Sequence, residues 1–349
     1  MVGSTLLAGA ATRRRPHAAG ADSARDGELE HARAIVAAHG EDSLSPFLLR
    51  PDKCFEFAAG GVLAYRMLGG TAVVSGDPVG SAEAVPVVLA QLLAKVHDGG
   101  GRVALYGCSA RHLATYREFG LRAICVGEEA VVDPASFGLE GRAVRKLRQS
   151  VNRMHRRGWR LEAHEGRQVD PGLEAEIDAL ERRWRSECGR VLGFAMAMGE
   201  FDPGIASSDL YLLARSPSGE LAGVMRFISH RGKLSLDTMR RVGETPNGLN
   251  EALVCTALEV ARERGVVEVS LNYAGLGHLI RRPAGDSKLR EAVRRLVLRR
   301  LGRHFQMERL VRFNEKFSPE WRPRYLVYES RAALAGSVVR VLQAEGYLR

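Results

Sequence analysis

The alternation of apolar and polar residues divides this chain into short strands and amphipathic helices. In the first part, two apolar runs flank Gly69 and Gly70, which is the spacing of a two-residue hairpin turn. The apolar periodicity then predicts helices over residues 28–38, 84–96 and 110–118, and strands over residues 62–68, 72–75, 102–106, 121–126 and 130–132.

The later part of the chain repeats this order of hairpin, helix and strand. Two apolar runs flank the turn SPSGE, and a third strand precedes a helix with one apolar face. The predicted strands cover residues 210–214, 221–229, 233–239, 266–272 and 324–328, and the predicted helices cover residues 249–264, 289–302 and 332–344. The repeat indicates an α/β (α+β) protein built from two similar halves.

The same pattern divides the sequence into four segments: a flexible tail (1–25), an N-terminal half (26–140), a basic connecting helix (141–160) and a C-terminal half (161–349). The tail lacks the apolar core of a secretory signal, and no apolar run is long enough for a transmembrane helix. We therefore expect a cytoplasmic protein. The five cysteines lack any CxxC or Cys/His pairing, so the sequence predicts no metal site.

Positive charge is concentrated in two places, although the formal net charge of the 349 residues is only +10. Residues 276–349 carry 17 Lys and Arg against 7 Asp and Glu, and residues 142–160 carry eight Lys and Arg with no acid. Such blocks suit a polyanion such as tRNA, an anionic lipid surface or a nucleotide, and the alternative is a solvated helix face. The candidate tRNA contacts on the two basic helices are Arg145, Lys146, Arg148, Arg153, Arg156, Arg157, Arg295 and Arg299.

The run LSLDTMRR at residues 234–241 carries the first candidate chemistry. We expect Asp237 at the end of a strand, at the rim of the sheet, where it could hold an amine or act as a base. Arg240 and Arg241 could bind a phosphate or carboxylate, although a structural Asp/Arg ion pair is the alternative. Asn247 and Asn250 bracket the next helix start and could cap it instead of binding substrate. Asn272 and Tyr273 complete the predicted substrate-binding set.

A second candidate is the aromatic and cationic segment RFNEKFSPEWRPRY at residues 312–325, which is too irregular for a helix. Lys316 is its candidate for contacting a phosphate or a leaving-group oxygen. Several catalytic motifs are missing: the phosphate loop of P-loop proteins, GxGxxG, HExxH and GxSxG. The phosphate-binding pattern of acetyl-CoA-dependent N-acetyltransferases is missing as well, so we expect no cofactor.

Four runs in the correct order resemble the catalytic domain of the phosphatidylglycerol lysyltransferase (multiple peptide resistance factor) family. They are YRMLGGTAVVSGDPVG, GLRAICVGEEAVVDPASFGLEGRAVRKLRQSVNRMHRRGW, LSLDTMRR and FNEKFSPEWRPRYL, and the similarity covers residues 28–348. The resemblance implies tandem N-acetyltransferase-like (GNAT) halves joined by a basic helix. It also implies transfer of an aminoacyl group from aminoacyl-tRNA, as co-substrate, to an acceptor hydroxyl.

Carried over by position, Asp237 and Arg240 match the essential acid and arginine of that family, and Lys316 matches the lysine of its C-terminal motif. Asp237 would bind the α-amine or deprotonate the acceptor, Arg240 would hold an acceptor phosphate or the tRNA terminus, and Lys316 would stabilise the oxyanion or the leaving ribose oxygen. Within FNEKF itself Lys316 is the only cation, whereas the resemblance leads us to expect a second Lys or Arg close to the first Phe.

Lipid-modifying members of the family carry an N-terminal membrane domain, whereas this chain begins with a short tail. Stand-alone relatives include a seryl transferase that acts on a hydroxylamine in valanimycin assembly. The acceptor is therefore expected to be either phosphatidylglycerol, reached by peripheral contact at the inner membrane face, or a small metabolite. The alternatives are a non-catalytic protein that binds nucleic acid or anionic membrane, and an acyl-CoA-dependent N-acetyltransferase.

Overall fold

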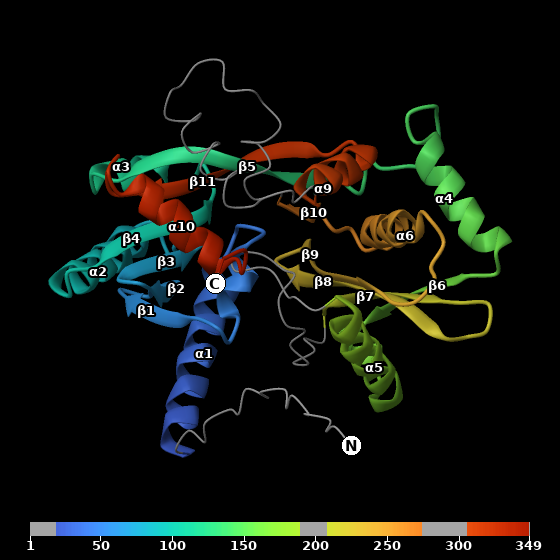
Figure 1. Ribbon diagram of the computed structural model, residues 1–349, viewed down its shortest axis with the longest axis horizontal. Helices are drawn as coiled ribbons and strands as arrows, with labels where there is room; N and C mark the ends of the chain where they lie inside the picture. Colours follow the sequence, from blue (N-terminus) through green and yellow to red (C-terminus); the bar gives the residue numbers. More distant parts are fainter. Residues whose placement is uncertain (1–18, 189–207, 274–305, 349) are drawn as a thin grey trace, which may run out of the picture.

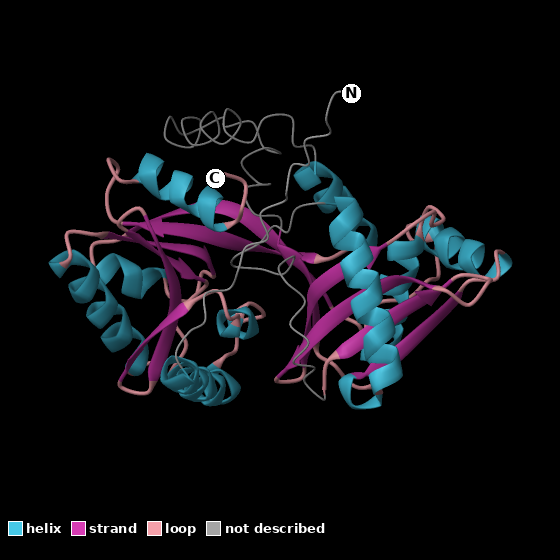
Figure 2. Ribbon diagram, turned by 60° about the horizontal axis from the view of Figure 1, so that its bottom comes forward, coloured by secondary structure: helices cyan, strands magenta, loops and turns pink. Residues whose placement is uncertain are grey.

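The fold is built on a single sheet, seen in a computed structural model that describes residues 19–188, 208–273 and 306–348. In these ranges eleven strands pair in the order β1-β2-β3-β4-β11-β5-β10-β9-β8-β7-β6 (Figure 1). Helices lie on both faces of the sheet (Figure 2). The strands are β1 (Cys54–Ala58), β2 (Gly61–Leu68), β3 (Thr71–Ser75), β4 (Arg102–Cys108), β5 (Arg122–Val132), β6 (Arg160–Glu165), β7 (Leu210–Arg215), β8 (Leu221–His230), β9 (Lys233–Arg241), β10 (Glu268–Tyr273) and β11 (Glu320–Tyr328).

The helices follow most of the predicted segments. They are α1 (Ala19–His39), α2 (Ala84–Asp98), α3 (Leu113–Glu118), α4 (Arg145–Arg156), α5 (Pro171–Cys188), α6 (Leu249–Glu263), α9 (Gln306–Asn314) and α10 (Leu334–Ala344), with short 3-10 turns η1 (Ser45–Leu49), η2 (Gly166–Gln168) and η3 (Glu315–Phe317). The segment at 312–325, predicted to be too irregular for a helix, lies in α9 over residues 312–314 and in the 3-10 turn η3 over residues 315–317, so that prediction is wrong for both stretches. The helix predicted at 289–302 lies outside the described residues.

The two halves repeat one plan, which confirms the N-acetyltransferase-like prediction. In the first, β1, β2 and β3 are antiparallel, and α2 carries the chain from β3 to the parallel strand β4. In the second, β6 to β9 are antiparallel, and α6 carries the chain from β9 to the parallel strand β10. The predicted β2/β3 hairpin is confirmed, with Gly69 and Gly70 at φ 52° and 76°, values that favour glycine.

The end of the chain returns to the first half. Strand β11 lies between β4 and β5 and is antiparallel to both, and β5 in turn pairs with β10. Helix α10 packs its buried residues Leu334, Val338 and Val341 with side chains of β3 and β4. The predicted boundary at residue 161 therefore assigns β11 to the C-terminal half, whereas the sheet places β11 between β4 and β5 of the N-terminal half.

In the second half the two faces of the sheet have separate cores. Helix α6 packs on one face, over Leu212 and Leu236 among others. Helix α5 packs on the opposite face, over Tyr211, Leu213 and Val224. This separation decides which candidate residues can share a site. Among the described residues, no helix combines the length and the apolar character needed to span a bilayer.

Candidate functional site

Asp237 lies inside strand β9, not at its end as the sequence predicted. In the β8/β9 register Arg226 pairs with Thr238 and Phe227 pairs with Leu236, so Asp237 is the extra residue of a β-bulge. A bulge re-aims a side chain that regular alternation would direct elsewhere. Asp237 is only 2% exposed. A carboxylate buried to this degree requires compensating charge.

The compensating charge comes from two arginines. Arg50, which lies just after η1 in the first half, forms an ion pair with Asp237. Arg226 of β8 lies 3.6 Å from Asp237, between its Nη1 and Oδ2, and its Nη2 lies 2.6 Å from Oδ2 of Asp209. Two acids and two cations thus meet between the two halves.

These charges line a cavity of about 230 Å³ between α1 and η1 on one side and β8 and β9 on the other. Apolar side chains line it as well, and a further arginine of α1 does so too: Val36, Ala37, Pro46, Leu49, Ile228 and Arg33. The lining is therefore amphipathic, with charged and apolar side chains. Such a site suits a ligand that carries both a polar group and an apolar part.

Burial controls the charges around this cavity. It raises the pKa of Asp209, even though Arg226 acts in the opposite direction. For Arg226, burial opposes the charge, but the carboxylates of Asp237 and Asp209 outweigh it and raise the pKa. Burial lowers the pKa of His230, which also lines the cavity, so its imidazole is neutral at pH 7.

Arg240 does not line this cavity. It is 1% exposed and packs against α5: Nε lies 3.1 Å from Oε2 of Glu181, and the guanidinium stacks 3.8 Å from the ring centroid of Trp184. The sequence offered a structural ion pair as the alternative for this arginine. The structure provides one with Glu181, and burial lowers the pKa of Arg240 although the carboxylates of Glu181 and Asp237 act in the opposite direction.

Lys316 lies on the other face of the sheet. It belongs to η3, and its Nζ lies 2.6 Å from Oε1 of Glu251 in the first turn of α6 and 5.7 Å from the ring centroid of Phe313. Because α6 and α5 pack on opposite faces, the sheet separates Lys316 from Asp237. The predicted trio is therefore not brought together in one pocket.

The other predicted substrate contacts are scattered. Arg241 and Asn247 are exposed, and the N-cap of α6 is Gly248 at φ 96°, so neither Asn247 nor Asn250 caps this helix with its side chain. The side chain of Asn272 accepts a hydrogen bond from the backbone N–H of Tyr273 at 2.9 Å.

Tyr273 is fully buried against Tyr106, and burial raises its pKa far above the usual range. None of these five residues (Arg241, Asn247, Asn250, Asn272 and Tyr273) lines the cavity at Asp237.

Helix α4 confirms the predicted basic amphipathic helix. Leu147 and Met154 are buried against the core that includes α6, whereas Arg145, Lys146, Arg156 and Arg157 are exposed. Two further predicted contacts have structural roles: Arg148 donates to the carbonyl of Leu139 at 2.6 Å, and Arg153 donates to that of Asn247 at 2.8 Å. Arg295 and Arg299 lie outside the described residues.

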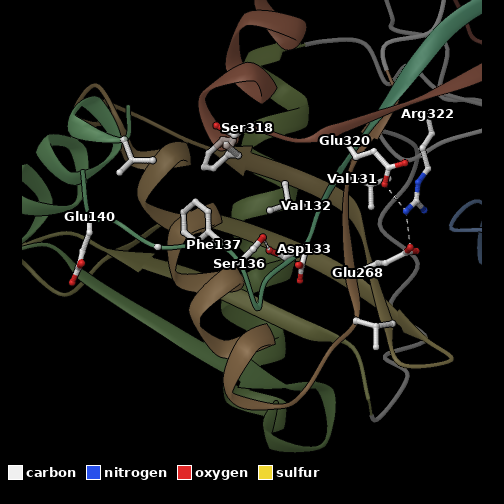
Figure 3. Close-up of a pocket in the computed structure, with 14 residues that line it drawn as sticks. Val131, Val132, Asp133, Ser136, Phe137, Glu140, Glu268, Ser318, Glu320 and Arg322 are labelled. Atoms are coloured by element: carbon white, nitrogen blue, oxygen red, sulfur yellow. Dashed lines mark hydrogen bonds and ion pairs between the residues drawn. The ribbon is translucent and has the colours of Figure 1, made fainter. Parts of the chain in front are cut away.

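A larger cavity of about 640 Å³ lies beside η3 and the segment that precedes α4 (Figure 3). Its walls carry four carboxylates, but Arg322 neutralises two of them, with its Nη2 2.7 Å from Glu268 and 2.8 Å from Glu320. The remaining two, Asp133 and Glu140, are exposed. This cavity is the larger of the two, whereas the smaller cavity contains buried carboxylates that are paired with arginines.

Sequence reasoning missed a buried polar cluster where the halves meet. Arg324 of β11 binds Glu129 of β5 and also Asp42, with 2.8 Å between Nη1 and Oδ2. Ser270 of β10 donates to Glu129 at 2.5 Å, and Ser43 donates to it as well. A signal was present, because Glu128 and Glu129 interrupt an apolar run, and the prediction broke one strand into two there.

Comparison with known proteins agrees with this architecture. The family model described as "Phosphatidylglycerol lysyltransferase, C-terminal" matches residues 33–328. The lysylphosphatidylglycerol biosynthesis bifunctional protein LysX of Mycolicibacterium gilvum is 34% identical over 337 residues, which cover 94% of this chain and 30% of that protein. The Nocardia farcinica LysX is 33% identical, with 29% of its length covered. The chain thus spans about 30% of the length of these relatives.

Two solved structures share the fold over most of the chain. L-PGS from Bacillus licheniformis has a TM-score of 0.79 and 25% identity, covering 91% of this chain and 97% of that one. A C-terminal domain of the DUF2156 type from Agrobacterium fabrum has a TM-score of 0.79 and 26% identity, covering 93% and 99%. The chain belongs to the family of phosphatidylglycerol lysyltransferase C-terminal domains.

Proposed function

We propose that this protein transfers an aminoacyl group from an aminoacyl-tRNA to an acceptor hydroxyl, and that the acceptor binds in the cavity at Asp237. The main supporting observation is the amphipathic lining of this cavity, which combines the charged Asp237, Arg50 and Arg226 with apolar side chains of α1 and η1. Family membership supports the transferase class. The apolar lining residues favour a lipid acceptor such as phosphatidylglycerol over a fully polar metabolite.

The proposed chemistry needs a base and a positioned hydroxyl. The acceptor oxygen bonds to the ester carbonyl carbon, the bond from that carbon to the ribose oxygen breaks, and the proton of the acceptor hydroxyl ends on the ribose oxygen. Asp237 is the group proposed to take up this proton and pass it on. Because the ester is already activated, positioning supplies much of the remaining acceleration.

The other two carried-over residues receive different roles in this proposal. Arg240, held by Glu181 and Trp184 of α5 three residues along β9, is proposed to position Asp237 without contacting substrate. Lys316 is proposed to contact the tRNA from the α6 face, away from its aminoacyl end, because the sheet separates Lys316 from Asp237. The exposed cations of α4, which packs on α6, would extend that contact to backbone phosphates without reading bases.

The test is transfer of a labelled aminoacyl group. Wild-type protein, Asp237→Asn and Asp237→Ala are incubated with a pool of labelled aminoacyl-tRNAs and either phosphatidylglycerol vesicles or a soluble extract. Loss of a general base predicts a rate at least about 100-fold lower for both variants. The matched control is Asp98→Asn at the exposed end of α2, which should transfer at the wild-type rate.

Full transfer by Asp237→Ala would refute the assignment of the base. Binding of charged tRNA by the wild-type protein without any transfer would instead favour the non-catalytic alternative. Labelled lipid and labelled extract product distinguish the two acceptor classes in the same experiment.

A further inference from the structure

Arg50 reaches the site from the other half of the molecule. Its partner Asp237 is 187 positions away in the sequence, and the two are joined across the boundary between η1 and β9. The segment that carries Arg50 runs from Asp42 to Lys53 and joins α1 to β1. A site on β9 is therefore completed by a loop of the first half.

Both ends of this loop are anchored. At its start, Arg324 holds Asp42, and the hydroxyl of Ser235 donates to the carbonyl of Ser43 at 2.9 Å. At its end, the buried ammonium of Lys53 donates to the carbonyl of Phe47 at 3.0 Å. The guanidinium of Arg50 also lies 5.5 Å from the ring centroid of Phe47. These contacts place Arg50 at a defined point on the cavity wall.

The two arginines at Asp237, Arg226 and Arg50, differ in the hydrogen bonds that their guanidinium groups form. Arg226 donates to Oδ2 of Asp209 through both Nε and Nη2, at 3.0 and 2.6 Å. Arg50 bonds Asp237 through Nη2, and within the described part of the chain its buried Nε has no hydrogen-bond partner. A guanidinium carries five N–H donors, so Arg50 retains donors for a ligand. Its side chain is also the more exposed, at 16% against 7%.

We propose that Arg50 is the anion-binding residue of this cavity and holds the phosphodiester of the acceptor, with the apolar part of the acceptor against the wall formed by α1 and η1. This assignment rests on the proposed function. A phosphodiester offers two oxygens to the planar fork of an arginine. Its arrival draws Arg50 away from Asp237, and the carboxylate then becomes available to the acceptor hydroxyl. Arg50 thereby couples occupancy of the cavity to the base.

The test measures binding separately from transfer. Isothermal titration of the full chain with dihexanoyl phosphatidylglycerol, below its micelle concentration, compares wild type with Arg50→Ala, Arg50→Lys and Asp237→Asn. Loss of a charge-assisted hydrogen bond predicts binding about 10- to 100-fold weaker for Arg50→Ala. Arg50→Lys keeps the charge but loses the fork, and should bind about 10-fold weaker. Asp237→Asn removes the competing anion, so it should bind as tightly as wild type or tighter.

The matched control is Arg183→Ala on α5, which removes an arginine paired with Glu187 and Glu220 at the surface and should leave binding unchanged. Wild-type affinity in Arg50→Ala would overturn the proposal. Equal losses in Arg50→Ala and Asp237→Asn would also overturn it, because they would mean a purely structural ion pair. If Arg50→Ala fails to fold, wild-type affinity in Arg50→Lys overturns the proposal instead.

Transfer assays on the same variants separate this proposal from the proposed function. Arg50-dependent binding without any aminoacyl transfer by the wild type would refute the proposed function and support the assignment of Arg50. Transfer by wild type, together with an unchanged KM for phosphatidylglycerol in Arg50→Ala, would support the function and refute the assignment.

Discussion

Replacement of Arg324 by Met should lower the free energy of unfolding more than any surface substitution, because it leaves two carboxylates without their cation. Arg324 is 2% exposed, bonds Glu129 through Nε at 3.1 Å and also through Nη2, and bonds Asp42 at 2.8 and 3.0 Å. Removing one partner of a buried ion pair costs about 3–5 kcal/mol. We therefore expect the free energy of unfolding to fall by about that amount at pH 7.

The cost should depend on pH. In the native protein burial alone would raise the pKa of Glu129, but Arg324 and the hydroxyls of Ser270 and Ser43 outweigh burial and lower it. A carboxyl with a lowered folded pKa stabilises the fold above its unfolded pKa of 4.5, and this contribution is lost as the pH falls. Without Arg324, burial dominates and the carboxyl takes up a proton. The difference between wild type and Arg324→Met should therefore shrink as the pH falls from 7 to about 4.5.

Urea unfolding followed by circular dichroism at several pH values measures this difference. The control is Arg322→Met, two residues along β11, where the arginine is 37% exposed and pairs with Glu268 and Glu320. Partly exposed pairs contribute about 0–1 kcal/mol, so this variant should change little. A loss below about 1 kcal/mol for Arg324→Met, or a larger loss that is the same at pH 5 and pH 8, would refute the reasoning.

Two further predictions concern Lys53 and helix α4. Burial lowers the pKa of Lys53 from 10.5 to about 8, so between these pH values the unfolded chain binds one proton more and the free energy of unfolding rises with pH. In urea titrations wild type should gain about 3 kcal/mol relative to Lys53→Met between pH 7.5 and pH 10.5. A constant difference would contradict the burial of a charged amine. Replacing the exposed Arg156 and Arg157 by Gln should reduce the magnitude of the slope of log K against log salt for tRNA binding by about 2, measured by filter binding. An unchanged slope would mean that α4 does not contact the tRNA.

Local sequence signals predicted the elements whose geometry depends on nearby residues. The Gly69-Gly70 turn needs two positive φ values, and glycine supplies them, so the hairpin was visible in the sequence. The apolar stripe of α4 was visible because Leu147 and Met154 recur at helical spacing. Strand β6 (RLEAHE) was missed because it is a short edge strand whose apolar face consists of only Leu161 and Ala163. Helix α5 was missed because most of its residues are polar or charged.

The candidate site shows the limit of such signals. Asp237 could be predicted from the sequence because an acid within an apolar run is unusual. Its predicted place at the rim of the sheet is wrong, because the strand continues to Arg241 and a β-bulge redirects the side chain. The expected Asp237, Arg240 and Lys316 set was drawn from the order of the motifs. The sheet, with α5 on one face and α6 on the other, separates Lys316 from Asp237 and Arg240.

The sequence by itself determined the repeated α/β plan, the basic helix and the family, because these follow from periodicity, composition and local motifs. Tertiary structure alone decided that β11 inserts between β4 and β5, that Arg324 meets Asp42 and Glu129, and that Arg50 meets Asp237. Each of these contacts joins residues far apart in the chain. Their partners are selected by shared burial and charge balance in the folded state, which no local pattern of residues encodes.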